Sequence, residues 1–369
     1  MSLPISVVIP LYNREDTIGR ALRSVRSQRP RPPDEIIVVD DGSSDHGAEI
    51  AASQGARVIT HGSNRGLSAA RNTGLAAARH DWVAFLDSDD EWLPDHLARL
   101  WSLRANHVLV GASSIRTGNG PSRGRLMGPV TSRRAVLMAP RDVLYPANPL
   151  APSAAMLRRD AALALGGFRP WDGVIEDLDL WVRLLAEHTG VVAPEVGIRY
   201  HIHEQQMSGD HGVMQRAVRR ALDSYVENGW CSSRTRALRE GVLAWDALRA
   251  RTDGSALVAA VRTLMRPTPA LGALGALGAR FLNRRESARW AEDGRPTVAL
   301  LPGGPRDGRA PMPRALAPVD LSSKSVLAAL GRLARRPTNF ATIPNAAWHL
   351  PLRLLRIEPV PGPDRSTLP

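Results

Sequence analysis

The first 90 residues alternate short runs of β-branched residues with stretches of helical periodicity. In the helical stretches apolar side chains recur three or four residues apart, as Ile18, Leu22 and Val25 do. The expected strands are Ile5–Ile9, Ile36–Val39, Arg57–Thr60 and Trp82–Leu86, and the expected helices are Glu15–Gln28, Ala48–Gln54 and Leu67–Ala78. Strands that alternate with helices predict an α/β fold with a parallel, doubly wound sheet.

Polar residues follow three of these strands at the point where each strand ends. The segments are Pro10–Asn13, Asp40–Ser44 and Asp87–Asp89. In doubly wound sheets, ligands bind beyond the carboxyl ends of the strands. The sequence therefore predicts that the three segments lie on one rim of the sheet and form a binding site there.

Residues 87–91 (DSDDE) place four acidic side chains within five positions at the end of an apolar strand. Clustered carboxylates raise one another's pKa unless positive charge lies among them. The start of a following helix would account for one or two of them, because acidic residues favour helix N-termini. Asp87 and Asp89 also suit Mg²⁺ or Mn²⁺, which bind one or two carboxylates together with phosphate oxygens and water. We interpret the cluster as a metal site or a phosphate-linked site.

Three further residues near the same rim have both a functional and a structural interpretation. Asp41 is placed to accept a hydrogen bond from a base or a ribose, although Asp-Gly turns are common. Tyr12 is placed to stack on a flat base, although an exposed aromatic residue in a loop is unremarkable. Arg71 is placed to neutralise phosphate charge, although a solvated arginine is the simpler interpretation.

Residues 166–184 (GGFRPWDGVIEDLDLWVRL) combine acids, tryptophans and a helix start. Glu176, Asp177 and Asp179 begin an apolar helix, where acidic residues also suit the helix dipole. Trp171 and Trp181 lie close in sequence, which indicates a pocket in which one carboxylate takes a proton. Both interpretations stay open from these residues alone.

The segment RYHIHEQQMS (199–208) carries two histidines. His201 and His203 are two residues apart, so in an extended chain both side chains point to the same side. Either is a candidate metal ligand, although a structural histidine is the more common case.

The net charge of +12 is unevenly distributed. Residues 1–230 hold 26 Arg against 26 Asp and Glu, whereas residues 231–369 hold 22 Lys and Arg against 10 Asp and Glu. Such asymmetry indicates an anionic surface as a partner of the C-terminal part, and no nucleic acid is expected. Cys231 is the only cysteine, and we see neither a signal peptide nor an apolar run long enough for a membrane span. A cytoplasmic protein, peripheral at the inner face of the cell membrane, is expected.

Four regions are expected along the chain. The α/β domain covers residues 1–213, and a helical extension with Val218, Leu222 and Tyr225 on one face covers 214–295. Residues 296–320 form a linker rich in Pro and Gly. Residues 321–369 form a basic tail. It begins with an expected helix that carries apolar residues on one face and Lys324 with three arginines on the opposite face.

Taken together and in this order, the segments resemble the family 2 glycosyltransferases of the GT-A fold, a Rossmann-like fold with a doubly wound mixed sheet. The resemblance covers roughly residues 4–210. It rests on the segments SVVIPLYNRE, VVDDGSSD, NRGLSAARNTGL, FLDSDDEW, GGFRPWDGVIEDLDLWVR and YHIHEQQMS.

The resemblance implies a role for each candidate residue. Pro10, Tyr12 and Asp41 would bind the nucleotide, and Asp87 and Asp89 the ribose and a divalent cation, Mn²⁺ or Mg²⁺. The resemblance also implies Asp177 as catalytic base and His203, in preference to His201, as a ligand of the metal or diphosphate. This assignment would make the metal and its nucleotide the positive partner of the acidic cluster.

The implied activity is an inverting transfer of one sugar from a nucleoside-diphosphate sugar, with a UDP-sugar as first candidate. The acceptor would be a glycan or a lipid-linked glycan, in the synthesis of a cell-surface polysaccharide or glycolipid. The Gln-x-x-Arg-Trp motif of processive members has only a distant counterpart, Glu286–Trp290, so a non-processive enzyme is expected. Two other functions stay open: a non-catalytic nucleotide-sugar-binding module, and a nucleotidyltransferase.

Overall fold

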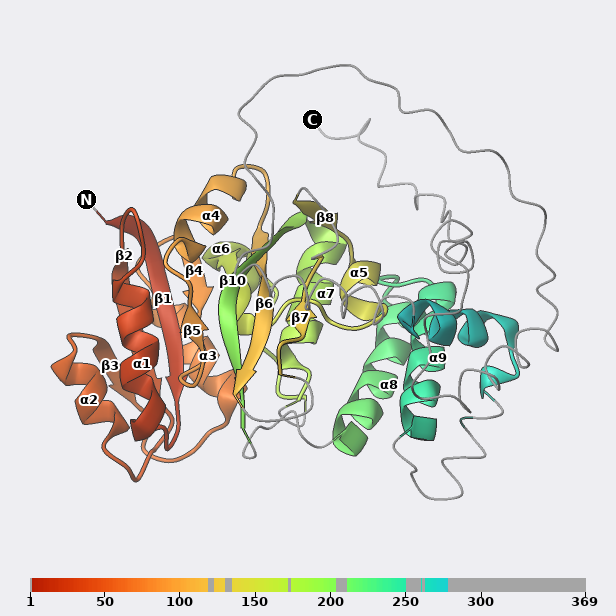
Figure 1. The fold of residues 1–369 in the computed structure, drawn as a ribbon, viewed down its shortest axis with the longest axis horizontal. Coiled ribbons are helices and arrows are strands. Elements are labelled where there is room, and N and C mark those ends of the chain that lie inside the picture. The colour runs from red at the N-terminus through yellow and green to blue at the C-terminus, as the bar shows by residue number, and fades with distance from the viewer. Residues whose placement is uncertain are drawn as a thin grey trace, which may run out of the picture.

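The computed structural model describes residues 2–118, 123–129, 135–171, 174–203, 211–249, 260 and 263–277. Within these residues, ten strands form one sheet (Figure 1). Eight of them follow the order β3-β2-β1-β4-β9-β6-β10-β5, while β7 pairs with β6 and β8 with β10. The expected linker (296–320) and basic tail (321–369) lie outside the described residues.

The N-terminal half of the sheet is parallel, as the alternation of strands and helices predicts. Its elements are β1 (Leu3–Leu11), α1 (Glu15–Arg26), β2 (Pro33–Asp40), α2 (Gly47–Ser53), β3 (Arg57–Thr60), α3 (Leu67–Ala77) and β4 (Trp82–Phe85). β1 pairs with β2 on one side and with β4 on the other, so that Val8 lies opposite both Ile37 and Phe85. β1 is buried along almost its whole length because strands flank both of its edges.

The direction in which successive strands are added to the sheet reverses between β1 and β4. The chain passes from β1 to β2 and β3 through α1 and α2, and then returns through α3 to β4 on the far side of β1. Since such crossovers are right-handed, α1 and α2 cover one face of the sheet and α3 the other. Sheets of this kind bind ligands at this switch point, beyond the carboxyl ends of the two strands.

Beyond β4 the sheet becomes mixed. The strands are β5 (Glu91–Trp92), β6 (Leu109–Gly118), β7 (Leu126–Met127), β8 (Val136–Met138), β9 (Ala155–Arg158) and β10 (Gly190–Ile202). The helices of this half are α4 (His96–Leu103), α5 (Pro140–Leu144), η1 (Pro152–Ala154), α6 (Arg159–Ala164) and α7 (Glu176–Glu187). β9 runs antiparallel to both β4 and β6, and β10 runs parallel to β6.

The residues after the acidic cluster form a strand and do not begin a helix. Glu91 and Trp92 are β5, which pairs antiparallel with β10, while α4 begins only at His96. The acids of residues 87–90 are therefore not explained as the start of a following helix. Arg199 lies opposite Glu91, so this pairing brings the end of β10 and its histidines to the acidic turn.

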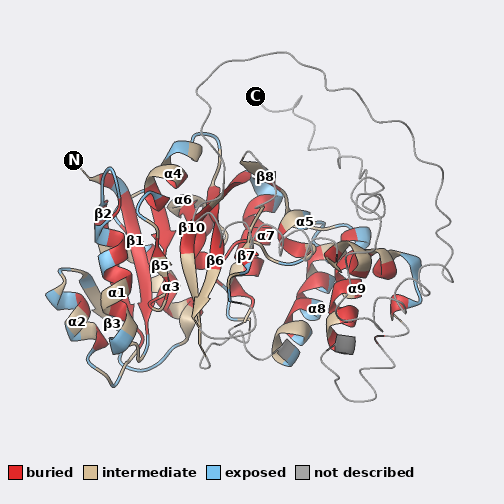
Figure 2. Cartoon of the chain, in the orientation of Figure 1, coloured by how far each residue is buried: buried red, intermediate tan, exposed pale blue. Residues whose placement is uncertain are grey.

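Aromatic rings fill the space between the sheet and α7. Phe168 packs edge-on against Phe85 and Trp181, with ring centroids 5.1 and 6.2 Å away. The Trp181 side chain is fully buried, and its indole N–H donates to the Leu150 carbonyl 3.1 Å away. Figure 2 shows the buried residues concentrated in the sheet and on the helix faces turned toward it. Trp181 is thus a core residue and does not line the pocket that the sequence predicted for it.

A buried ion pair joins α7 to its neighbours. Arg183 contacts Asp179 at 2.7 Å and donates to the carbonyls of Leu165 and Gly167 at the same distance. The Tyr225 hydroxyl donates to the other Asp179 oxygen, 3.2 Å away. Buried charges are tolerated when they are paired and hydrogen-bonded, as these are. Asp179, in the first turn of α7, therefore has a structural role.

The C-terminal extension consists of helices. The sequence predicted one helical stretch from about residue 214 to 250, but the structure has two helices, α8 (His211–Glu227) and α9 (Ser233–Arg249). They separate at Gly229, whose φ of 71° suits glycine. The expected apolar face of α8 packs into the same core as the sheet. A second cluster joins α9 to residues further along the chain, and its buried members are Ala244, Trp245, Ala247, Ala260, Leu264, Ala270 and Ala273. Across the described residues, none of the helices combines the length and apolarity that crossing a bilayer requires.

Candidate functional site

Arg71 joins the acidic turn after β4 to the start of α7. Its guanidinium contacts an Asp87 oxygen and a Glu176 oxygen, both at 2.7 Å. Arg71 is 1% exposed, and its position on α3 between the two carboxylates keeps the pKa of its guanidinium above the usual value. The sequence assigned the positive partner of the acids to a metal and its nucleotide, but the structure supplies part of that charge with Arg71. In this structure two nitrogens of the guanidinium are engaged by these two carboxylates.

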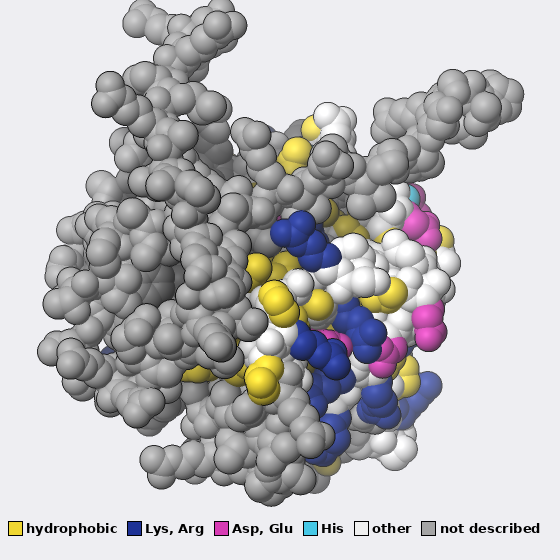
Figure 3. Space-filling model, turned by 90° about the vertical axis from the view of Figure 1, so that its right-hand side faces the viewer, with side chains coloured by type: hydrophobic (Ala, Val, Ile, Leu, Met, Phe, Trp, Pro, Cys, Tyr) yellow, Lys and Arg dark blue, Asp and Glu magenta, His cyan; other side chains and the backbone are white. Residues whose placement is uncertain are grey.

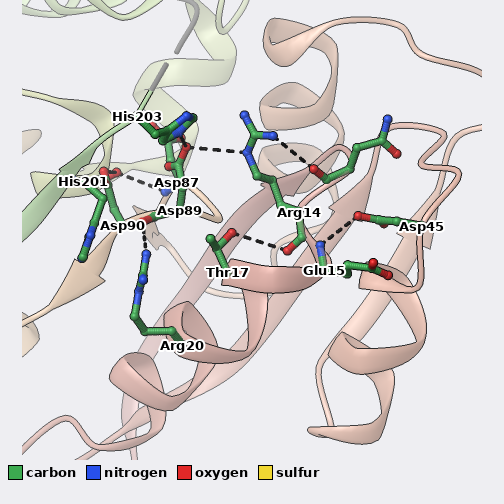
Figure 4. A network of polar contacts seen from close by, with 12 residues as sticks. Arg14, Glu15, Thr17, Arg20, Asp45, Asp87, Asp89, Asp90, His201 and His203 are labelled. Atoms are coloured by element: carbon green, nitrogen blue, oxygen red, sulfur yellow. Dashed lines mark hydrogen bonds and ion pairs between the residues drawn. The ribbon is translucent and has the colours of Figure 1, made fainter. Parts of the chain in front are cut away.

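Asp89 lies on the open side of the same turn. The His203 Nε2 atom is 2.8 Å from an Asp89 oxygen, and the Arg14 Nε atom is 3.8 Å from that oxygen. Arg20 donates to the Asp89 carbonyl at 2.7 Å. Figure 4 shows Arg14 directed toward the acidic turn, His203 close against Asp89 and Arg20 below. The turn is therefore bordered by two arginines near α1 and by the end of β10.

The donor set of this turn suits a divalent cation bound together with a diphosphate. Asp89 and His203 already touch, and they offer a carboxylate and an imidazole to Mn²⁺. Asp87 contributes one further oxygen, because only its Oδ1 atom is held by Arg71. Among the described residues no three His, Cys, Asp or Glu side chains are grouped to hold a metal on their own. Phosphate oxygens and water would have to complete the ligand shell, as is usual for such cations.

Asp90 fixes the shape of the acidic turn. Its carboxyl group accepts the Ser153 hydroxyl at 2.5 Å and the His201 backbone N–H at 2.9 Å. Burial, and then the charges of Asp89 and Asp87, raise the pKa of Asp90 well above its usual value. Ser153 also accepts the Asp87 backbone N–H, 3.1 Å away. Asp90 therefore acts as a structural acid that ties β10 and η1 to the turn.

The two histidines at the end of β10, His201 within the strand and His203 just beyond it, have different surroundings. His203 faces Asp89, whereas the His201 Nε2 atom lies 3.7 Å from a Glu91 oxygen. Burial lowers the pKa of the His201 side chain. The histidine in contact with the Asp-x-Asp turn is His203, the one that the resemblance favours.

Asp177 is half-buried in the first turn of α7. One of its oxygens accepts the Asn148 amide at 2.9 Å, and the other accepts the Leu178 backbone N–H at 2.7 Å. Burial and the adjacent Glu176 charge raise the pKa of Asp177 to about 7. A carboxylate with a pKa near neutrality is suited to accept a proton at physiological pH. Because Arg71 joins Glu176 to Asp87 through two ion pairs, Asp177 is connected to the acidic turn through its neighbour Glu176.

The residues expected at the nucleotide lie at the ends of β1 and β2. Tyr12 is 46% exposed just beyond β1, so its ring is open to a stacking partner, while Pro10 is buried within that strand. Asp41 is buried, and it accepts the backbone N–H groups of Arg65 and Gly66 at 2.9 and 2.8 Å. Its oxygens are thus engaged by the loop that leads into α3 and by His61, whose Nδ1 atom lies 2.6 Å from Oδ1.

Two side chains, one in the segment that leads into α7 and one at the start of this helix, carry unpaired polar atoms. Glu176 Oε2 and Trp171 Nε1 are both buried without a hydrogen-bond partner. Unpaired buried polar atoms are uncommon and need an explanation, which a bound hydroxyl-rich ligand would provide. Of the two tryptophans expected beside the acids, Trp171 is the one whose indole nitrogen has no partner in the protein.

Asn148 and Ser153 complete the site, and sequence reasoning did not find them. Asn148 contacts the Asp177 carboxylate, and Ser153 connects Asp87 to Asp90. The only sequence signals at these positions are Asn148-Pro149 and Pro152-Ser153, which predict turns and no chemistry.

The sequence matches the profile of Glycosyl transferase family 2 over residues 6–166. It is 33% identical over 219 residues to an uncharacterized protein of Mycobacterium tuberculosis (strain CDC 1551 / Oshkosh), a stretch that covers 53% of this chain and 67% of that protein. An uncharacterized glycosyltransferase of Haemophilus influenzae is 24% identical over 234 residues, 60% of this chain and 77% of that protein. The succinoglycan biosynthesis protein ExoO of Rhizobium meliloti is 41% identical over 99 residues, 26% of this chain and 28% of that protein.

Solved structures share the fold. TarS 1–349 of S. aureus, in complex with UDP-GlcNAc, gives a TM-score of 0.54 at 16% identity and covers 80% of this chain and 92% of that chain. The mannosyltransferase PcManGT of Pyrobaculum calidifontis, in complex with GDP-Man and Mn²⁺, gives 0.50 at 20% identity and covers 79% and 85%. These similarities confirm the GT-A fold that the sequence predicted.

Proposed function

The chain belongs to glycosyltransferase family 2, and we propose that it transfers one sugar from a nucleoside-diphosphate sugar to a hydroxyl group, with inversion at the anomeric carbon. The observation that carries the proposal is Asp177. A carboxylate with a pKa of about 7 begins α7, and its neighbour Glu176 is joined through Arg71 to Asp87. This arrangement sets a general base beside a turn suited to a diphosphate.

In the proposed reaction Asp177 accepts the proton of the acceptor hydroxyl while that oxygen attacks the anomeric carbon. The new bond joins the acceptor oxygen to the sugar, and the bond between the sugar and the diphosphate breaks. The nucleoside diphosphate leaves with the electron pair. Arg14 and Arg20 lie beside Asp89, so positive charge is available where the diphosphate would lie.

Donor binding is assigned to the ends of β1 and β4. Tyr12 would stack on the base of the nucleotide, and Pro10 and Asp41 would lie beside that base. Asp87 would bind the ribose. Asp89 and His203, with Asp87, would hold Mn²⁺ or Mg²⁺, which when bound neutralises charge on the departing diphosphate. The structural neighbours bind UDP-GlcNAc and GDP-Man, so both UDP- and GDP-sugars are candidates.

A glycan or lipid-linked glycan is the proposed acceptor, in the synthesis of a cell-surface polysaccharide or glycolipid. A relative named for succinoglycan biosynthesis supports this class of product. The unpaired buried atoms of Trp171 and Glu176 suit an acceptor rich in hydroxyl groups. We expect one sugar to be added in each encounter.

The test of the function is a donor panel. Purified full-length protein is incubated with UDP- and GDP-sugars, Mn²⁺ and simple glycan acceptors, and nucleoside diphosphate is measured with and without acceptor. Acceptor-dependent release of a nucleoside diphosphate supports the proposal. Donor binding without release would indicate a non-catalytic module, and release of sugar 1-phosphate in place of a nucleoside diphosphate would indicate a nucleotidyltransferase.

Removing the carboxylate of Asp89, the proposed metal ligand, should strongly reduce the sugar-transfer activity. Asp89→Ala should lower kcat/KM by about 10²-fold or more while the protein stays folded, because the diphosphate charge is then less well neutralised. EDTA should have the same effect on the wild type, and added Mn²⁺ should reverse it. Asp160→Ala, at an exposed acid that pairs with Arg158, is the matched control and should keep wild-type activity. Undiminished turnover in EDTA would refute the metal assignment.

The basic C-terminal part is proposed to bind an anionic membrane. Figure 3 views the side on which α8 and α9 lie and shows arginines gathered there, and α8 itself exposes Arg216, Arg219 and Arg220. Each basic residue near an anionic surface contributes about 1 kcal/mol. Full-length protein should therefore sediment with vesicles rich in phosphatidylserine at low salt and dissociate at high salt. A variant that ends at Gly294 should bind clearly less, and equal binding by the two proteins would refute a role for the tail.

A further inference from the structure

The segment between α5 and η1 presents an amide to the catalytic side of α7. Asn148 Nδ2 donates to Asp177 at 2.9 Å, and Asn148 Oδ1 accepts the Leu150 backbone N–H at 3.1 Å. Because the oxygen of the amide is engaged by a backbone donor, the nitrogen has to face the carboxylate. The orientation of this side chain is thus fixed from both ends.

The same segment is held from the opposite side by the C-terminal helices. The Tyr145 hydroxyl donates to the Gly272 carbonyl at 2.9 Å. Arg239, on α9, donates to the Pro146 carbonyl. Tyr145 is therefore attached to the helix at residues 267–277 and Pro146 to α9, three and two residues before Asn148.

Glycines make this attachment possible. The segment LGALGALG (271–278) is biased in composition. A Cβ atom on Gly272 would lie 2.1 Å from the Leu238 carbonyl oxygen, and one on Gly275 would lie 2.1 Å from the Tyr145 hydroxyl. Both distances are far below a normal contact, so only glycine lets this helix approach α9 and Tyr145 so closely.

We propose that Asn148 is a positioning residue for the Asp177 carboxylate, and that the C-terminal helices hold Asn148 in place through Tyr145 and Pro146. The extension would then be part of the catalytic unit. The proposal rests on the function proposed above, in which Asp177 is the base. It adds a group that orients this base and a structural reason for the Gly-Ala-Leu segment.

The Asn148 amide has two effects on the base. It holds one carboxylate oxygen in a fixed direction, and it favours the ionised form, because a donor stabilises negative charge. The charged groups that also act on Asp177 are Glu176, Arg71 and Asp87, and none of them is changed by substitution at residue 148. Loss of the amide should therefore make the carboxyl group harder to ionise.

Asn148→Ala in the full-length protein tests the proposal without relying on turnover alone. With ¹³C-labelled aspartate, and Asp177→Asn to assign the signal, the Asp177 carboxyl should titrate about one pH unit higher in the variant than in the wild type. At pH 7, kcat should fall about tenfold or more, while KM for the best donor of the panel stays unchanged. Asn228→Ala, whose amide bonds only within the end of α8, is the control and should change neither value.

Tyr145→Phe tests the attachment to the extension. It keeps the ring and removes the bond to Gly272, so titration and kcat should change in the same direction as in Asn148→Ala, but less. An Asn148→Ala protein that folds and shows wild-type titration and kcat overturns the proposal. If Asn148→Ala does not fold, Tyr145→Phe decides, and wild-type values there overturn the role of the extension. An active Asp177→Asn variant would instead refute the proposed function itself, which keeps the two failures distinct.

Discussion

Asp177→Asn should lower kcat by about 10²–10⁴-fold, the usual contribution of general acid–base catalysis, and leave the affinity for the nucleotide sugar unchanged. The asparagine keeps the shape of the side chain but cannot accept the proton of the attacking hydroxyl. Donor binding is assigned to Tyr12, Asp87 and Asp89, which the substitution does not touch. Steady-state kinetics with varied donor, together with calorimetric titration of the donor, separates the two effects.

The same residue sets a pH dependence. Because the base must be ionised, wild-type kcat should decrease as the pH falls through about 7, the pKa to which burial and Glu176 raise Asp177. The residual kcat of Asp177→Asn should not show this decrease at low pH. If donor affinity is lost while kcat survives, Asp177 binds the donor and the base lies elsewhere. Glu176 would then be the next candidate, since Asp179 is fully buried against Arg183.

Arg71→Leu should lower the free energy of unfolding by about 3–5 kcal/mol, because removing one partner of a buried ion pair leaves uncompensated charge. Here the substitution would leave two carboxylates, Asp87 and Glu176, without their cation. Transfer activity should also be lost, since both the acidic turn and the start of α7 depend on this contact. Chemical denaturation at pH 7, with the turnover assay, measures both effects.

Two comparisons make the Arg71 result specific. Arg65→Leu, at an exposed position of the loop before α3, should change the stability by no more than about 0.5 kcal/mol. The deficit of Arg71→Leu should be smaller at pH 4, because burial raises the pKa of Asp87 and this carboxyl group can protonate once its cation is gone. A variant as stable as the wild type would show that the bridge contributes little, and that the acids depend on a bound cation after all.

The sequence was sufficient for the parallel half of the fold. Its β-branched runs and helical periodicity are local signals, and β1 to β4 lie within a few residues of the expected ranges. Because parallel strands end on the same rim, the ends of β1, β2 and β4 were expected together. The antiparallel insertion of β9 between β4 and β6 has no such signal, since these strands meet across long connections and not through a hairpin turn.

The partners of the candidate residues were the harder part. The sequence identified Asp87, Asp177 and Arg71 separately, but nothing local indicates that Arg71 joins Asp87 to Glu176, which is 105 residues away. Whether an arginine on a helix is solvated or buried depends on which element packs over it. For Arg71 that element is α7, whose position is not a local property of the sequence. Asn148 was missed for the same reason, since its amide acts only through a contact made by folding.

The anomeric configuration of the product tests the central claim most directly. A single displacement assisted by one carboxylate inverts the anomeric carbon, whereas a double displacement through a covalent intermediate retains its configuration. Proton NMR of the product, recorded soon after mixing with the best donor of the panel, gives this configuration from the coupling constant of the anomeric proton. We expect a β-linked product from an α-linked donor, and Asp177→Asn should form little product in the same time. A product that keeps the donor configuration would contradict the role assigned to Asp177.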